Sequence, residues 1–388
     1  MRFRDTAQRA GDRAGIAMAT ALGGLVIIGV MIAGVFFTSN QELRVGTNTF
    51  VQERAFRAAE FGVNAALASW SNAEMLLLPL GGMKQVVYDS SAKGWRDSVT
   101  ITRLNVTTFL IASTGTAFGG IQGSSRRRTA LLVRLSVPSL KTKAALTVAD
   151  MVSLGNTPIT GYDTNPLGWT SCPPLEDSVA AVVVKDSNDV VFTKLCPQNL
   201  CLQGTPKLLK SATAADTSTY SAVDDETFAS LTMYSPKVYT SLSQPPNRLE
   251  PAVTGGVCDK TSTKNFGDPR RSTPAGQCES YFPIIHAKGS SYELELKGGS
   301  GQGILLVEGD LTISGDFTFY GPVIVRGRFE SKNSAKVHGA VMVANMVNGN
   351  NAIGGLSTIN YSSCAIKKAF ENAIPPKRVI ERAWMEVF

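Results

Sequence analysis

Histidine is scarce in this 388-residue chain, in which His286 and His338 are the only two. Histidine is a frequent general base at neutral pH and a common metal ligand, so its scarcity argues against metalloenzymes and histidine-dependent hydrolases. The glycine-rich segment at 298–303, GGSGQG, lacks the Lys and Ser/Thr that complete a phosphate-binding loop. We therefore expect no enzyme activity, no cofactor and no metal.

Charged residues are also few, at 18% of the chain, while 43% are hydrophobic and the formal net charge is +7. This composition is typical of a folded chain with room for two or three domains. The run Arg126–Arg128 falls in a predicted strand, where such a run is more typical of a solvated face than of a phosphate-binding surface. We expect no nucleic-acid partner.

Charge is absent from the 22 residues between Ile16 and Phe37. As a helix they would extend about 33 Å, against about 30 Å for the hydrocarbon core of a bilayer. Arg2, Arg4 and Arg9 are among the basic residues before this segment, so the positive-inside rule predicts a cytoplasmic N-terminus. The prediction is a single pass through the inner membrane, with the C-terminal part outside the cytoplasm. A removable signal peptide is the alternative, although its apolar region usually spans only about 7 to 15 residues.

Residues 38–80 continue with a helical pattern of apolar residues three to four apart, which predicts one long helix reaching about Trp70. The apolar positions are Leu43, Phe50, Val51, Phe56, Phe61, Val63 and Leu67. Residues 81–140 change to short alternating runs at 99–104, 107–113 and 129–137, which predict antiparallel strands.

The N-terminal sequence, RAGIAMATALGGLVIIGVMIAGVFF followed by QERAFRAAEFG, resembles type IV pilin-like proteins, in particular the PilX-type minor pilin family. The resemblance implies cleavage after Gly15 by a prepilin peptidase, with Ile16 as the new N-terminus. It also implies that the helix binds other pilin-like subunits and that the chain takes part in assembling a type IV pilus or related filament.

The sequence departs from this family at Thr20. Typical major pilins carry a glutamate at the fifth mature position, which is thought to pair with the terminal amine of a neighbour. Threonine lacks the charge needed for such a contact, which is strong in apolar surroundings. The departure favours a subunit at the tip or in the initiation complex over a shaft subunit.

The chain has six cysteines, all between positions 172 and 364, and an even number in an exported protein favours disulfides. Proximity favours a pair between Cys258 and Cys278, and leaves open how Cys172, Cys196, Cys201 and Cys364 combine. Zinc is a poor alternative, because the CPQNLC spacing is wide and no histidine is near.

A six-residue repeat is the strongest internal regularity. Its markers are Gly303, Gly309, Gly315, Gly321, Gly327, Asn333, Gly339 and Asn345. The positions two and four after each marker are almost all apolar, whereas Thr312, Ser314 and Thr318 are among the polar residues between them. This alternation predicts a β-helix-like solenoid with Phe317 and Phe319 inward and Thr318 outward, and with Gly or Asn at left-handed corners. A plain antiparallel meander is the alternative. A similar pattern at 144–163 predicts a first rung.

We thus expect an α+β protein. Its regions are a leader (1–15), a transmembrane segment (16–37), an amphipathic helix (38–80), an antiparallel β region (81–140), a first rung with a disulfide-bearing insertion (141–290), and a β-solenoid with a C-terminal helix and tail (291–388).

The leading function is a minor pilin-like structural subunit. The alternative is a membrane-anchored envelope β-helix protein that binds or cleaves polysaccharide, for which the repeat offers Glu308, Asp310, Asp316 and Glu330. Asp310 and Asp316 each follow a glycine, where Asp is favoured simply as a turn residue.

Overall fold

The computed structural model describes residues 5–90, 94–119, 123–135, 138, 140–155, 158–169, 172–193, 196, 200–223, 226–344, 351–374, 377–378 and 384–387. The chain divides into two compact units. Unit 1 comprises 1–69, 78–134 and 378–388, and unit 2 comprises 70–77 and 135–377.

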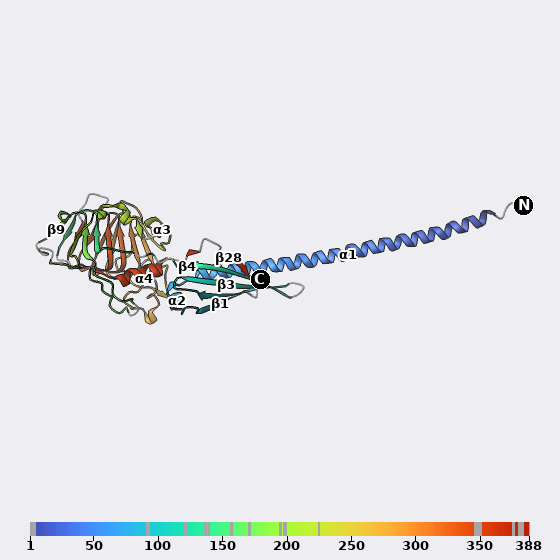
Figure 1. Ribbon diagram of the computed structural model, residues 1–388, viewed down its shortest axis with the longest axis horizontal. Coiled ribbons are helices and arrows are strands. Elements are labelled where there is room, and N and C mark those ends of the chain that lie inside the picture. Colours follow the sequence, from blue (N-terminus) through green and yellow to red (C-terminus); the bar gives the residue numbers. More distant parts are fainter. Residues whose placement is uncertain are drawn as a thin grey trace. The chain divides into compact units, whose positions relative to one another are not determined.

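Unit 1 is built on α1 (Asp5–Ala68), a single uninterrupted helix of 64 residues (Figure 1). The predicted long helix is therefore confirmed. Its C-terminal part lies on an antiparallel sheet and buries a narrow stripe of mostly small residues: Val51, Ala55, Ala58, Ala59, Val63 and Ala66. Leu43 and Phe50, which the periodicity assigned to a packed face, are instead 66% and 67% exposed.

The sheet of unit 1 contains β1 (Met83–Ser90), β2 (Trp95–Arg103), β3 (Thr108–Phe118), β4 (Ser124–Arg134), β27 (Lys377–Arg378) and β28 (Trp384–Val387). Strands β1 to β4 pair antiparallel in sequence order, which confirms the predicted antiparallel region. The C-terminal strand β28 returns to pair antiparallel with β4. The tail was expected to belong to the repeat region, so this assignment was wrong.

Close backbone approach holds α1 on this sheet. A Cβ atom at Gly115 in β3 would lie 2.2 Å from the carbonyl oxygen of Ala55 and 2.4 Å from the amide nitrogen of Ala59. Only glycine fits at that point, because these are backbone atoms that cannot move aside. The small residues of the stripe therefore bring the helix axis close to the strands.

The described part of unit 2 consists mainly of short parallel strands, and it also contains the helices α2 (Asn72–Leu77), α3 (Phe228–Met233) and α4 (Ser363–Ala373). Its strands in the first part of the unit are β5 (Ala144–Val148), β6 (Val152–Leu154), β7 (Ile159–Thr160), β8 (Ala180–Val184), β9 (Val190–Phe192), β10 (Leu202–Gln203), β11 (Leu208–Lys210), β12 (Ala222–Val223), β13 (Glu226–Thr227), β14 (Lys237–Tyr239), β15 (Val253–Thr254) and β16 (Val257–Cys258). Those in the second part are β17 (Ile284–Ala287), β18 (Glu293–Lys297), β19 (Ser300–Gln302), β20 (Ile304–Val307), β21 (Asp310–Ser314), β22 (Thr318–Val325), β23 (Phe329–Ser331), β24 (Lys336–Val343), β25 (Asn351–Ile353) and β26 (Thr358–Tyr361).

The pairing within the repeat is parallel, with partners 18 residues apart. Leu305 pairs with Val323, Leu311 with Phe329, and Phe319 with Val337. An offset of 18 is three six-residue intervals, so each strand lies beside the strand three intervals later. The antiparallel meander is thus excluded for these strands. Figure 1 shows them side by side, with α4 along the same unit.

Glycines occupy one column of this arrangement for a steric reason. A Cβ atom at Gly321 would lie 2.0 Å from the carbonyl oxygen of Gly303, and one at Gly339 would lie 2.2 Å from that of Gly321. All three have positive φ. Gly303 lies between β19 and β20 as the corner prediction expected, whereas Gly321 and Gly339 lie within β22 and β24. Gly309 and Gly327 have no positive φ, so glycine is needed there for close approach alone. Asn345 lies outside the described residues.

The predicted apolar core is confirmed, but the predicted polar face is only partly correct. Phe317 and Phe319 are fully buried in one large core cluster. Thr312, Ser314 and Thr318 were expected to be exposed, yet all three are buried. Other segments cover them, since Thr312 donates a hydrogen bond to Glu293 and Thr318 accepts one from Arg270.

The stretch at 144–163 does not pair with the first strands of the repeat. Strand β5 pairs with the end of β24, through Leu146 and Val341, and β6 pairs with β25. Residues early in unit 2 therefore extend the parallel sheets beyond their C-terminal strands, contrary to the expected first rung. The predicted C-terminal helix is confirmed as α4, which begins at the N-cap Ser362.

Candidate functional site

The most unusual surface of the chain is the N-terminal half of α1, which we call the apolar arm (Met18–Phe37). Its large side chains are between 54% and 69% exposed on all sides of the helix: Met18, Leu22, Leu25, Val26, Ile27, Ile28, Val30, Met31, Ile32, Val35, Phe36 and Phe37. A helix that is apolar all round is stable only inside apolar surroundings. Within the described residues, α1 is the one helix long and apolar enough to cross a membrane.

Small residues interrupt the apolar arm at Gly23, Gly24, Gly29 and Gly34, where a Cβ atom would meet nothing within 4 Å. Glycines of this kind let two helices approach closely in an apolar medium. The arm thus combines bulky apolar groups with points of close approach.

Residues assigned to processing lie near the start of α1. Gly15 and Ile16 are within the helix, which runs from Asp5, and Thr20 follows one turn later. Cleavage after Gly15 stays a prediction.

The six cysteines form three disulfides in unit 2. Cys258 joins Cys278, as proximity predicted, Cys196 joins Cys201, and Cys172 joins Cys364 across 192 positions of the sequence. Sequence spacing gave no indication of the last pair, because it depends on where the insertion meets α4. The three bridges fit an oxidising compartment.

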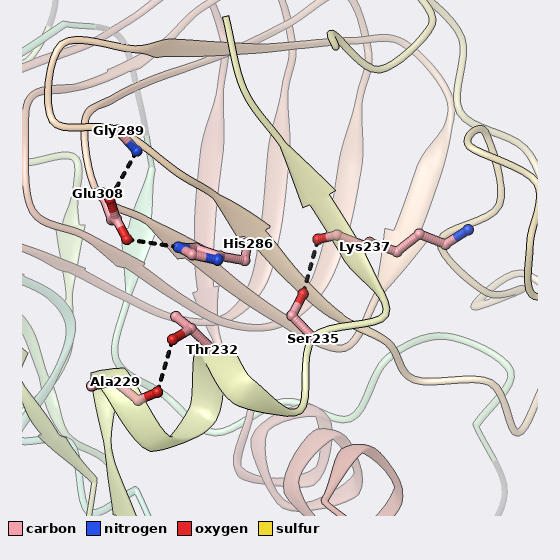
Figure 2. Close-up of polar contacts among 7 residues, drawn as sticks. All are labelled: Ala229, Thr232, Ser235, Lys237, His286, Gly289 and Glu308. Carbon is pink, nitrogen blue, oxygen red and sulfur yellow. Dashed lines mark hydrogen bonds and ion pairs between the residues drawn. The ribbon is translucent and has the colours of Figure 1, made fainter. Parts of the chain in front are cut away.

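The structure brings His286 on β17 together with Glu308, which follows β20, a contact that sequence reasoning missed. Nε2 of His286 lies 2.8 Å from Oε1 of Glu308, and the other carboxylate oxygen accepts a hydrogen bond from Gly289 N–H (Figure 2). Burial raises the pKa of Glu308, but Gly289, His286 and Arg326 outweigh it and leave that pKa below its ordinary value.

Nearby hydroxyl groups are engaged by the backbone. Thr232 donates to the carbonyl oxygen of Ala229, and Ser235 donates to that of Lys237 (Figure 2). Ser235 also donates to the carbonyl oxygen of Ile284. The Ser235 bonds hold the turn between α3 and β14 against β17, and this arrangement lacks the nucleophile–base geometry of a triad.

The remaining carboxylates of the repeat are dispersed. Asp310 accepts a hydrogen bond from Arg328 N–H and forms an ion pair with its side chain, Glu330 pairs with Lys332, and Asp316 occupies a turn with φ of 60°. No group of three or more His, Cys, Asp or Glu residues in the described ranges is arranged to hold a metal ion.

His338 stacks on Tyr320, with 4.8 Å between ring centroids. Burial, with Lys336 and Arg270 nearby, lowers the pKa of His338 to about 4. The imidazole is therefore neutral at physiological pH and packs as an aromatic ring.

Comparison with known proteins gives little further information. No family model matches the chain, and no curated protein matches it. Among solved structures, the chain is similar to the competence-associated pilin ComZ from Thermus thermophilus, at 12% sequence identity. That match covers 87% of this chain and 97% of the other, with a TM-score of 0.22, which does not establish a common fold.

Proposed function

We propose that this protein is a minor pilin-like structural subunit that takes part in assembling a type IV pilus or a related filament. The observation that carries the proposal is α1, whose apolar arm is exposed while its C-terminal part packs on an antiparallel sheet. One continuous helix thus joins an apolar environment to a folded unit.

The arm first requires a membrane and then, in a filament, the arms of other subunits. Both environments keep the same apolar side chains away from water, and the arm's glycines favour close packing between helices. In this proposal the arm spans the inner membrane, and the part of unit 1 that follows the arm lies outside the cytoplasm together with unit 2. The three disulfides of unit 2 support that orientation.

The proposal places the subunit at the filament tip or in the initiation complex. Thr20 lacks the carboxylate that would hold the terminal amine of a neighbour, and unit 2 adds a bulky body to each copy. A shaft repeats its packing many times, whereas a tip needs one or a few copies.

Unit 2 would display a β-solenoid at that tip. The 18-residue offset between parallel partners and the column of Gly303, Gly321 and Gly339 support this architecture. The protein would act by assembly and not by turnover, in keeping with the dispersed carboxylates of the repeat.

The proposal is tested by counting copies in sheared filaments with quantitative mass spectrometry. Wild-type protein should be present at low copy number, and deletion of its gene should reduce the number of filaments. Replacing Thr20→Glu should raise the copy number, because the new carboxylate can pair with an amine, whereas Thr20→Gln should not.

Wild-type protein that is abundant along the shaft would contradict the tip assignment. Protein absent from filaments, with assembly unchanged on deletion, would favour a membrane-anchored envelope protein instead.

A further inference from the structure

Unit 2 contains a cavity of about 360 Å³ that the assembly role does not use. Its walls come from α2, α4 and the loop before β17, represented by Leu77, Glu371 and Arg271. The volume falls within the range of small-molecule sites, about 300 to 1,000 Å³. It suits one or two sugar-sized rings and not a folded partner.

The loop wall is rigidly built. Asp268 is fully buried and accepts hydrogen bonds from the backbone and side chains of Ser272 and Thr273. The Cys258–Cys278 disulfide fastens the same region, and the buried Gln302 donates to the carbonyl oxygens of Glu279 and Tyr281. A wall held in this way needs little ordering when a ligand binds.

Trp169 supplies an aromatic wall. Its Nε1 donates to the carbonyl oxygen of Pro269 at 2.9 Å, and its ring stacks on Tyr320 and meets Phe282 edge-on. The nearby Cys172–Cys364 disulfide ties this segment to α4. The indole is therefore fixed in orientation before any ligand arrives.

Basic and acidic side chains line the cavity in equal numbers. Arg271 forms an ion pair with Glu279, and Glu371 lies on α4 beside Lys368. Burial raises the pKa of Glu371, and Lys367 and Lys368 oppose that rise. Because both signs are equally present, the lining favours neither an anion nor a cation.

One polar atom of the lining is left without a partner. Asn372 uses its Nδ2 to donate to the carbonyl oxygen of Lys368 at 2.8 Å. Its Oδ1 is buried and has no hydrogen-bond partner within the described part of the chain. A buried acceptor of this kind is costly unless a donor reaches it.

We propose that this cavity binds a neutral saccharide ring, such as the terminal residue of a glycan. The apolar C–H face of a pyranose packs on an aromatic ring such as Trp169, and a rotation of the Asn372 side chain on ligand binding would turn its buried Oδ1 toward the hydroxyl groups of the ring. A neutral ring also fits the balanced charge. The site is independent of the assembly role, because every lining residue belongs to unit 2.

The test is saturation-transfer NMR on the full chain, in a detergent without a sugar head group. The probes are D-glucose, D-galactose, D-mannose, N-acetylglucosamine and N-acetylgalactosamine, with the anionic N-acetylneuraminic acid for comparison. At least one neutral sugar should receive saturation at its ring protons and should outcompete the anion.

Two substitutions locate the binding. Trp169→Leu should abolish the signal, whereas Trp95→Leu in unit 1 should leave it unchanged. Asn372→Ala should weaken binding about fivefold or more, whereas Asn188→Ala at an exposed position should not. If the Trp169→Leu variant fails to fold, the loss of binding in the Asn372→Ala variant is the result that tests the proposal.

The proposal is overturned if no neutral sugar binds, if only the anion binds, or if binding survives Asn372→Ala undiminished. None of these results bears on filament assembly, which is measured separately through copy number in sheared filaments.

Discussion

Gly62 of α1 lies directly against the carboxylate of Asp97 on β2. A Cβ atom at Gly62 would be 1.6 Å from Oδ2 of Asp97 and 2.7 Å from Oγ of Ser113. The glycine thus makes room for a fully buried acidic side chain between the helix and the sheet. Ser113 donates a hydrogen bond to Oδ1 of that carboxylate.

Replacing Gly62→Ala should loosen α1 from the sheet, because the added methyl group overlaps side chains that have no free space. The expected cost is about 1–3 kcal/mol or more. Hydrogen exchange of the α1 amides between Val51 and Ala66 measures it as a lower opening free energy. Gly46→Ala is the control, since a Cβ there meets nothing within 4 Å and should slightly stabilise the helix. Equal effects of the two substitutions would contradict this packing.

Asp97 should make unit 1 less stable as pH rises. Burial raises the pKa of Asp97 from 3.8 to about 6, against opposing hydrogen bonds from Ser113 and Ser98. The folded state therefore binds its proton more tightly than the unfolded state. Stability is greatest below about pH 4 and falls as pH rises to about 6, by about 3 kcal/mol in total.

The measurement is hydrogen exchange of β2 and β3 amides, expressed as opening free energies at pH 4 and pH 7. Wild type should lose stability between the two, while Asp97→Asn should lose less and be the more stable of the two at pH 7. An Asp97→Asn variant with the same pH dependence as wild type would show that another group is responsible.

Phe317 should be a major contributor to the stability of unit 2. Truncation to Phe317→Ala should cost about 3–5 kcal/mol, because it leaves a cavity in the core. Thr318→Ala should cost about 1 kcal/mol through loss of the hydrogen bond from Arg270. Lys336→Ala, at the exposed partner of Thr318 in β24, should cost little. Urea titration with pulse proteolysis measures the loss of unfolding free energy for each of the three substitutions. A different order of these losses would contradict the inward orientation of Phe317.

The disulfides should stabilise the folded chain to different extents, according to the length of the loop that each one closes. In the chain-entropy model, removing Cys172–Cys364 costs about 5 kcal/mol and removing Cys196–Cys201 about 2 kcal/mol. Their separations are 192 and 5 residues. Paired Cys→Ala variants compared by thermal unfolding test the order. Thiol counting on denatured, unreduced wild-type protein should find none of the six cysteines free.

Local periodicity predicted the elements of this fold well, but not their partners. The charge-free run and the three-to-four spacing gave α1, and alternation placed Phe317 and Phe319 in the core. The buried stripe of α1 was predicted only at Val51 and Val63. Its alanines were missed, because alanines carry no strong periodic signal and their role depends on Gly115 in a distant strand.

Long-range contacts account for the other differences. The burial of Thr318 depends on Arg270, which comes from an insertion 48 residues away. The pairing of β28 with β4, and of β5 with β24, likewise joins segments that no local pattern relates. The cavity of unit 2 was equally absent from the sequence prediction, because Trp169 and Asn372 come to line it together only through the folding of unit 2.

The central claim is that this chain is a processed pilin-like subunit, and its N-terminus tests that claim most directly. Peptide mass spectrometry of the protein from sheared surface filaments should find a chain that begins at Ile16, with Gly15 and the basic leader removed. A chain that still begins at Met1, or one that begins beyond Phe37 and so has lost the apolar arm, would contradict the account.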